Sequence, residues 1–348
     1  MDRVAIKDEG ILLEATDLDF ENEAVLNPTC VTIDPVVHMF YRAVSKNQMI
    51  SSIGYAQLAD NKIISRAKEP ILKPEHDYEI MGIEDPRITY LDGTYYIFYT
   101  AYDGKNARVA YATSKDLKKF TKHGLIIPSL TYSEAEQFFC IHSSAAAACF
   151  ELYKKRYKFR LEPDALLWEK DAFLFPKKIN GRCALIIRIL PGIQIIYFDD
   201  FNQLKSHKYW DAYLNDLDDF VIMEPKFIFE HKHIGGGCPP IETKDGWLLI
   251  YHAVEDTPEG VIYYGCAALL DLNDPTKVIG RLDYPLLEPE APWEQEGDVN
   301  NVVFPTGTYI DGDRLYIYYG AADKLIAIKS LILEELIWAL KHCAYGTC

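Results

Sequence analysis

Two adjacent carboxylates stand in the segment GIEDPR, residues 82–87, directly before an apolar, tyrosine-rich run. Neighbouring residues of an extended chain alternate sides, so Glu84 and Asp85 should not face the same way. We expect one of them to face solvent or Arg87 and the other to enter a central cavity. A carboxyl whose pKa is raised by burial there could protonate a leaving oxygen as a general acid. On this segment alone, a surface turn with a local ion pair is the better explanation.

Single polar residues also interrupt runs that are otherwise apolar. Arg188 lies within LIIRIL, and His252 lies within LLIYHAV. A charge inside an apolar strand must be paired or bind an anion, so Arg188 is a candidate ligand. By itself, His252 is better explained as a satisfied core histidine. Asn27 before its proline could form an Asx turn, and Asp323 could cap a turn.

The strands that would position these residues recur along the chain. Asp-Gly or Asn-Gly pairs favour tight hairpin turns, because those turns need positive φ, and four such pairs precede apolar and aromatic runs. A fifth run, VVHMFYRAV at 36–44, lacks the pair. A second run follows each of the five, and their centres are spaced by roughly 60–90 residues, enough for a four-stranded sheet plus loops. The pattern predicts an all-β fold, a five-bladed β-propeller. The four pairs are Asp92-Gly93, Asn180-Gly181, Asp245-Gly246 and Asp311-Gly312.

Two segments depart from this repeat. Residues 129–165, which include four consecutive alanines, form an insertion between the second and third blades, for which we expect a mostly β structure. Residues 330–346 have apolar residues at helical spacing and predict a C-terminal helix. It would pack on the propeller or on a neighbouring subunit, so a homo-oligomer stays open. The predicted organisation is one catalytic propeller domain over 1–330 and a helical tail over 331–348.

Composition and charge narrow the class of protein. The chain has 348 residues, and its 36 basic and 52 acidic residues give a formal net charge of −16, which argues against binding to nucleic acid or to an anionic membrane. No run reaches about 18 apolar residues and the first ten residues lack a leader pattern, so we expect a soluble cytoplasmic protein. The eight cysteines include no C-x-x-C pair, and the histidines and aspartates lack metal-ligand spacing. We therefore expect buried free thiols and no metal.

The segment GIEDPRITYLDGTYYIFYTAYDG, residues 82–104, resembles the signature of glycoside hydrolase family 130, the inverting β-mannoside phosphorylases with a five-bladed propeller. The resemblance extends over all five predicted blades, and several long motifs follow one another in order. Only the 129–165 insertion and the C-terminal tail lack counterparts. The further matching motifs are NPTCV (27–31), FYRAV (40–44), KDAFLFPKKINGR (170–182), IGGGCPPIETKDGWLLIYHAV (234–254), YYGCAALLDL (263–272) and NNVVFPTG (300–307).

The resemblance implies a role for each matching position. The aspartate of E-D-P-R is the general acid in the family, and here it is Asp85. The sugar at the cleaved end is held there by an asparagine, an arginine and an aspartate, whose matches are Asn27, Arg42 and Asp323. The phosphate ligands correspond to Lys170, Arg188, His252 and Tyr263. His233 stands where the family often has lysine, a departure expected to weaken one phosphate contact or to make it pH-dependent.

These residue types suit phosphorolysis. Inverting hydrolysis needs one carboxyl as the acid and a second to activate water, whereas phosphate is already an anionic nucleophile and needs cations and donors to hold it beneath C1. The leading hypothesis is an inverting phosphorylase that cleaves a non-reducing β-mannosyl linkage, β-1,2 or β-1,4, to give α-mannose 1-phosphate. Inorganic phosphate is the co-substrate, and no other cofactor is implied. Whether Asp85 delivers its proton directly or through a sugar hydroxyl stays open.

Two other functions also stay open. An inverting β-mannosidase would need a second carboxylate, such as Glu224 or Glu242, to reach the attacking water. The retained Arg188 argues against that reaction, as do the other matched phosphate ligands. A non-catalytic carbohydrate-binding propeller would bind sugar without turnover, and its binding would survive the loss of Asp85.

Overall fold

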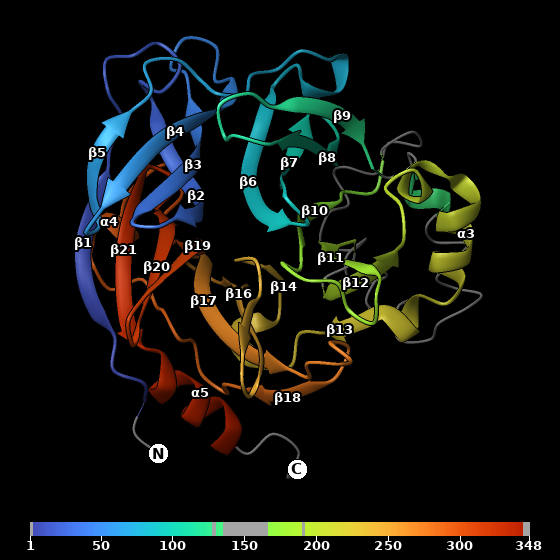
Figure 1. The fold of residues 1–348 in the computed structure, drawn as a ribbon. Helices are drawn as coiled ribbons and strands as arrows, with labels where there is room; N and C mark the ends of the chain where they lie inside the picture. The colour runs from blue at the N-terminus through green and yellow to red at the C-terminus, as the bar shows by residue number, and fades with distance from the viewer. Residues whose placement is uncertain (1–2, 127–129, 135–165, 190–191, 344–348) are drawn as a thin grey trace.

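The computed structural model describes residues 3–126, 130–134, 166–189 and 192–343, and most of these residues lie in β-strands. The strands form four hydrogen-bonded sheets, which comprise five antiparallel units that lie round a common centre (Figure 1). The first two units belong to one eight-stranded sheet, because Ser51 of the first unit pairs in parallel with Gly82 of the second. The first unit contains β2 (Ala24–Ile33), β3 (Val36–Val44), β4 (Ser51–Ala59) and β5 (Lys62–Arg66), and the second contains β6 (Gly82–Leu91), β7 (Thr94–Tyr102), β8 (Ala107–Ser114) and β9 (Thr121–Leu125).

The third unit contains β10 (Lys170–Leu174), β11 (Cys183–Arg188), β12 (Ile193–Phe198) and β13 (Val221–Met223). The fourth contains β14 (His233–Gly236), β16 (Gly246–Thr257), β17 (Gly260–Leu270) and β18 (Val278–Arg281), with β15 (Ile241–Thr243) also paired to β16. The fifth contains β19 (Val303–Asp311), β20 (Arg314–Ala321), β21 (Leu325–Ile332) and the N-terminal β1 (Lys7–Leu13).

Apolar clusters lie between successive units and hold them together. One cluster joins residues of the first and second units, such as Phe40 and Ile97, and others join the second to the third, the third to the fourth and the fourth to the fifth. A fifth cluster joins the last unit back to the first, where Tyr318 packs with Val25. Each sheet is therefore covered on both faces by its neighbours, which explains why its strands are apolar along their length rather than alternating.

The chain closes on itself through its N-terminal strand. β1 pairs antiparallel with β21, and Ile11 faces Ala327 in the register. The innermost strands also contact one another in turn, β2 with β6, β6 with β10, β10 with β14 and β19 with β2. Because the first and last parts of the chain share one unit, residues from both ends of the sequence reach the same centre.

The predicted hairpins are present, with a shift in two of their turns. Asp92 and Gly93 form the two-residue turn between β6 and β7, with φ of 47° and 76°. In the hairpin between β15 and β16, Gly246 already pairs with Thr243, so the turn begins one residue earlier than the Asp-Gly pair. Between β19 and β20, the turn begins one residue later, because Asp311 pairs with Arg314.

Buried glutamates brace four of the five units. Each accepts a hydrogen bond from a tyrosine in the second strand of its unit and pairs with a cation in a strand further out; Glu79, Tyr99 and Lys122 are one such set. All four glutamates have no exposed surface. In each network the tyrosine directly precedes the residue of the second strand that faces the centre, so the network holds the strand in place next to that residue. The other sets are Glu21–Tyr41–Arg66, Glu230–Tyr251–Arg281 and Glu294–Tyr319–Lys329.

Helices lie outside the sheets. The C-terminal helix α5 (Leu333–His342) lies beside the fourth and fifth units (Figure 1). Its Leu336 and Leu340 belong to the apolar cluster between those units. The remaining helices are α3 (His207–Asn215), α4 (Pro292–Gln295), η1 (Asp77–Glu79), η3 (Gln203–Lys205), η4 (Leu217–Phe220) and η5 (Ile228–Glu230). Among the described residues, no helix is both long and apolar enough to cross a membrane. The insertion predicted over 129–165 lies outside the described residues except for 130–134.

Candidate active site

One cavity gathers all nine residues that the sequence predicts for the site. Its volume is about 150 Å³. The first, second and fifth units contribute Asn27, Arg42, Asp85 and Asp323 to its wall. The third and fourth units contribute Lys170, Arg188, His233, His252 and Tyr263. The residues expected to bind the sugar thus come from one arc of the molecule, and those expected to bind phosphate come from the other. Asp171, Val302 and Phe304 complete the lining.

Left-handed residues on the innermost strands place three of the polar side chains. Asn27 in β2, Asp85 in β6 and Asp171 in β10 have φ of 49°, 50° and 58°. Each stands at a register shift, where the inner strand has an extra residue relative to its partner. Asparagine and aspartate tolerate this conformation better than other side chains with a Cβ. The same bulge, repeated in three units, directs three polar side chains into one cavity.

The second strands contribute a matching set. Arg42 pairs with Leu26, Arg188 pairs with Lys170 and His252 pairs with Gly235, so all three stand at the same position relative to the inner strand. Arg42 and His252 each follow a tyrosine braced by a buried glutamate. Equivalent positions in neighbouring units converge on the centre, which brings together residues more than 200 positions apart.

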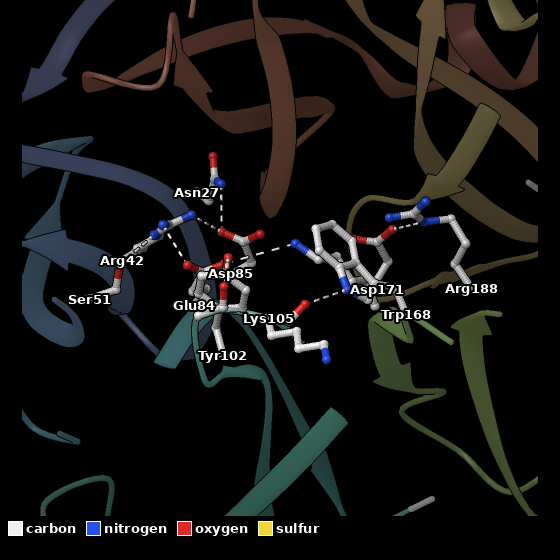
Figure 2. Close-up of polar contacts among 12 residues, drawn as sticks. Asn27, Arg42, Ser51, Glu84, Asp85, Tyr102, Lys105, Trp168, Asp171 and Arg188 are labelled. Atoms are coloured by element: carbon white, nitrogen blue, oxygen red, sulfur yellow. Dashed lines mark hydrogen bonds and ion pairs between the residues drawn. The ribbon is translucent and has the colours of Figure 1, made fainter. Parts of the chain in front are cut away.

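Asp85 is held by a hydrogen bond and by positive charge (Figure 2). The Asn27 Nδ2 donates to Asp85 Oδ1 at 2.7 Å, and Arg42 Nη1 lies 3.6 Å from the same oxygen. Burial on its own raises the pKa of Asp85, but the charges of Arg42 and Lys170 outweigh it and hold the pKa below its ordinary value. These neighbours therefore keep Asp85 ionised at neutral pH.

Glu84 occupies the same cluster, and the expectation that it or its neighbour would face solvent or Arg87 is wrong. Glu84 is 7% exposed; its Oε1 accepts from Arg42 Nη2 at 2.7 Å, and its Oε2 lies 3.9 Å from Lys170 Nζ (Figure 2). Arg87 is fully buried and donates from Nε to the Gly237 carbonyl at 2.6 Å. The bulge explains the difference, because a residue with φ of 50° at Asp85 breaks the alternation of an extended strand.

The third unit supplies a second carboxylate. Arg188 Nε donates to Asp171 Oδ2 at 2.6 Å, so the charge inside that apolar strand is paired (Figure 2). His252 Nε2 lies 3.9 Å from the same oxygen. Burial is the largest influence on His252 and lowers its pKa to about 4, which makes the ring neutral at pH 7. The rings of Phe304 and Tyr263 lie 4.5 and 6.4 Å from it, centroid to centroid.

Asp323 lies in the short connection between β20 and β21, with φ of 53°. Burial raises its pKa to about 6; Arg42 opposes this rise, whereas the nearby Asp85 adds to it. Arg42 therefore acts on both aspartates, yet the pKa of Asp323 is raised and the pKa of Asp85 is lowered. The sequence alternatively predicts that Asp323 caps a turn. In the structure Asp323 lies within the turn between β20 and β21, and its own backbone is left-handed.

Two glycines leave room for these side chains. A Cβ at Gly235 would lie 2.5 Å from Asp171 Oδ2 and would overlap the His252 ring. A Cβ at Gly320 would overlap the Asn27 Oδ1. Neither glycine has positive φ, so the space they leave, rather than their backbone freedom, is what the site requires.

Sequence reasoning missed Asp171 as a residue of the cavity and missed the pairing of Glu84 with Arg42 and Lys170. Asp171 belongs to the matched motif KDAFLFPKKINGR, but no role was expected for it. The signal for Asp171 was its position, because it occupies the same place in the third unit as Asn27 in the first unit and Asp85 in the second. Glu242, one expected base for hydrolysis, instead pairs with Lys177 at 2.9 Å on the surface, and neither it nor Glu224 lines the cavity. Within the described ranges, no group of three or more histidine, cysteine or acidic side chains is arranged to hold a metal ion.

Known proteins resemble this chain over almost its whole length. The model of glycoside hydrolase family 130, described as β-1,4-mannooligosaccharide phosphorylase, matches residues 13–342. The chain is 33% identical over 341 residues to the 1,2-β-oligomannan phosphorylase of Thermoanaerobacter sp. strain X514, covering 95% of this chain and 97% of that protein. It is 35% identical over 347 residues to the β-1,2-mannobiose phosphorylase of the same organism, again covering 95% and 97%.

A solved structure supports the fold. It comes from work on glycoside hydrolases of the mannoside phosphorylase family that target β-1,2 mannosidic linkages in Candida mannan. It superposes with a TM-score of 0.72 over 96% of this chain and 95% of that chain, at 22% identity. The family match and the two relatives above 30% identity lead to one conclusion. The chain belongs to glycoside hydrolase family 130, the family of the β-mannoside phosphorylases.

Proposed function

We propose that this protein is an inverting phosphorylase, in which inorganic phosphate attacks C1 of a non-reducing terminal β-mannosyl residue. The products are α-mannose 1-phosphate and the shortened acceptor. The observation that carries the proposal is the division of the cavity wall. One arc presents Asp85 with Asn27 and Arg42, and the opposite arc presents cations and neutral donors.

We further propose that the five sheet units are the blades of a β-propeller with the cavity on its axis. The apolar clusters between successive units and the pairing of β1 with β21 support this architecture. The sequence predicts the boundary at residue 330, but β21 continues to Ile332, so we propose that the catalytic propeller ends there and that α5, Leu333–His342, is its helical tail. In this arrangement each blade contributes equivalent positions to the centre.

In the proposed reaction, Asp85 supplies the proton for the leaving oxygen, directly or through a sugar hydroxyl. Asn27, Arg42 and Asp323 bind the mannosyl hydroxyls. Because Arg42 and Lys170 hold Asp85 ionised, the acid must gain a proton before it can donate one to the leaving oxygen. The negative charge of an incoming phosphate acts in that direction, since it offsets the cations that lower the pKa of Asp85.

The phosphate pocket combines charge with neutral donors. Lys170 and Arg188 neutralise the anion, and the neutral His252 and Tyr263 can donate hydrogen bonds to its oxygens. His233 takes the place where the family often has lysine, so its contact to phosphate is charged only when its ring is protonated. This arrangement holds the nucleophile on the arc that faces Asp85.

We propose a β-1,2-linked mannoside as the substrate. The two relatives that match over almost the whole chain act on β-1,2-linked mannosides, as their names state. The family model is described by a β-1,4 activity, so the β-1,4 linkage is the comparison to make.

The test is a product assay with and without phosphate. We expect β-1,2-mannobiose to give mannose 1-phosphate only when phosphate is present, with β-1,4-mannobiose a poorer substrate. Asp85→Asn should lower this rate by about 100- to 10,000-fold, the usual contribution of a general acid. Asp92→Asn, a surface aspartate in the β6–β7 turn, should leave the rate unchanged. Free mannose formed equally without phosphate would overturn the proposal.

A hydrolase is the second candidate, and one observation favours it. Asp171 adds a carboxylate to those of Asp85 and Asp323 in the cavity wall, on the arc expected to hold the nucleophile, and an inverting hydrolase requires such a group as its base. That carboxylate is paired with Arg188 at 2.6 Å, which lowers its basicity and favours the phosphorylase. Mannose release without phosphate that depends on Asp171 would establish the hydrolase instead.

A further inference from the structure

Asp171 presents a physical problem for an anion pocket. Its side chain is buried among the residues expected to bind phosphate. Burial raises the pKa of Asp171, but Arg188 and Arg87 hold it below its ordinary value, so this carboxylate is ionised at neutral pH. A negative charge in that place opposes a phosphate anion by simple repulsion. Its presence therefore needs a compensating function.

The backbone around Asp171 is built to present this side chain. Asp171 has φ of 58° at the bulge in β10, a conformation that costs free energy for any residue with a Cβ. On the neighbouring unit, Gly235 leaves out the side chain that would collide with the Asp171 Oδ2 and with the His252 ring. Two separate elements thus accommodate one carboxylate, which is more than a local ion pair needs.

The contacts of Asp171 join the two units that form the phosphate arc. Its Oδ2 accepts from the Nε of Arg188 at 2.6 Å and lies 3.9 Å from the Nε2 of His252. The His252 Nδ1 is buried and has no hydrogen-bond partner among the described residues.

We propose that Asp171 is a positioning residue for phosphate, which orients the Arg188 guanidinium and faces the His252 ring so that both meet the anion in one geometry. Asp171 itself does not touch the substrate. The ion pair limits the rotation of a long side chain, so less freedom is lost when phosphate binds. This inference rests on the proposed phosphorolysis, because it assigns the arc from Lys170 to Tyr263 to phosphate.

Three variants test the inference. Asp171→Ala removes the acceptor, and Asp171→Asn retains an oxygen that can accept from Arg188 and tolerates the left-handed backbone. Asp92→Ala is the matched control, because Asp92 also has positive φ, at 47°, and its side chain lies on the surface beside Lys178. Each is assayed by initial rates over a range of phosphate and of β-1,2-mannobiose concentrations. Each is also titrated with inorganic phosphate alone in a calorimeter.

The expected result is a split between the two substrates. Asp171→Ala should raise the KM and the Kd for phosphate by about tenfold or more, the usual effect of losing a hydrogen bond to a charged group, while the KM for mannobiose changes by less than about threefold. Asp171→Asn should fall between Asp171→Ala and the unmodified protein, and Asp92→Ala should match the latter. If Asp171→Ala does not fold, the same split in Asp171→Asn decides the question.

Failure of this inference and failure of the proposed function give different results. Phosphate-dependent turnover with equal changes in both KM values, or with unchanged phosphate affinity, would overturn the role of Asp171 and leave the phosphorylase standing. If the unmodified protein bound phosphate without turning over, a tenfold weaker Kd in Asp171→Ala would still support the positioning role. A protein that binds no phosphate and loses mannose release on Asp171→Asn would overturn both, and Asp171 would be the base of a hydrolase.

Discussion

Individual side chains in this site have their ionisation set by neighbours from other units. Asp85 and Asp323 both face Arg42, yet the pKa of Asp85 is lowered and that of Asp323 is raised to about 6. Asp85 has the Asn27 hydrogen bond and the nearby Lys170. Asp323 is buried, and the charges of Asp85, Asp298 and Glu84 oppose that of Arg42. Two aspartates in one cavity are thus prepared for different tasks.

The raised pKa of Asp323 predicts a cost in stability at neutral pH. The folded chain binds this proton more tightly than the unfolded chain, whose ordinary pKa is 3.8, so the free energy of unfolding falls as pH rises from 3.8 to about 6. Above pH 6 the full cost is present, on the order of 3 kcal/mol. Asp323→Asn should therefore raise the melting temperature at pH 7 by a few degrees and should not raise it at pH 4.

The same variant should lose function, because it removes an acceptor for mannosyl hydroxyls. We expect kcat/KM for the mannoside to fall about tenfold or more, with the KM for phosphate nearly unchanged. Asp313→Asn is the matched control, since Asp313 is an exposed aspartate in the turn between β19 and β20 of the same unit. Thermal unfolding at the two pH values measures the first effect. If Asp323→Asn melted at a lower temperature than the unmodified protein at pH 7, this would contradict the conclusion that the buried, ionised Asp323 destabilises the fold.

At the scale of elements, one bulged inner strand and one braced second strand recur from unit to unit. The inner strands direct Asn27, Asp85 and Asp171 to the centre, and the second strands direct Arg42, Arg188 and His252. The repeat could have been read from the sequence in its FYRAV, LIIRIL and IYHAV motifs. What varies between units is the residue type at an equivalent place, and that variation separates the sugar arc from the phosphate arc.

Two glycine substitutions should separate these arcs. Gly235→Ala places a methyl group against Asp171 and His252, so we expect a higher KM for phosphate with little change for the mannoside. Gly320→Ala displaces Asn27 from Asp85, so we expect a lower kcat/KM for the mannoside with little change for phosphate. Each shift should be about tenfold. The two variants are controls for each other, and steady-state kinetics that show the same effect in both would refute the division.

At the scale of the whole molecule, the ring of units is closed by a strand from the other end of the chain. β1 is the outermost strand of the fifth unit and pairs with β21. Its Leu13 is buried in the cluster between the fifth and first units. Asp323, between β20 and β21, belongs to the unit that this strand completes. Closure of the ring therefore affects the geometry of the site as well as stability.

Removal of residues 1–13 should weaken this closure. The deletion exposes an edge strand and the apolar side chains beneath it, and we expect the free energy of unfolding to fall by roughly 3 kcal/mol or more, with a tendency to aggregate. Deletion of residues 1–5, which precede β1, is the control. Chemical unfolding of the two truncated chains measures the difference. Equal stability would show that β1 is dispensable for closure.

The sequence alone determined the types of element and most of the residues of the site. Hairpin signals such as Asp92-Gly93 act locally, so the strands and their repeat could be predicted from the residues themselves. The nine cavity residues were implied by the resemblance of motifs such as GIEDPR and FYRAV to glycoside hydrolase family 130. The positions of Asp171 and Glu84 could not be predicted. A left-handed residue reverses the side that a strand presents, and period-two reasoning assumes that none is present.

Only the tertiary structure decided the ionisation states and the pairings. The low pKa of Asp85, the neutral ring of His252 and the pairing of Arg188 with Asp171 depend on burial and on charges contributed by units far apart in the chain. Residue type indicates what a side chain can do, but the Coulomb and desolvation contributions that select its protonation state act through space. They are defined only when the five units have closed round one centre.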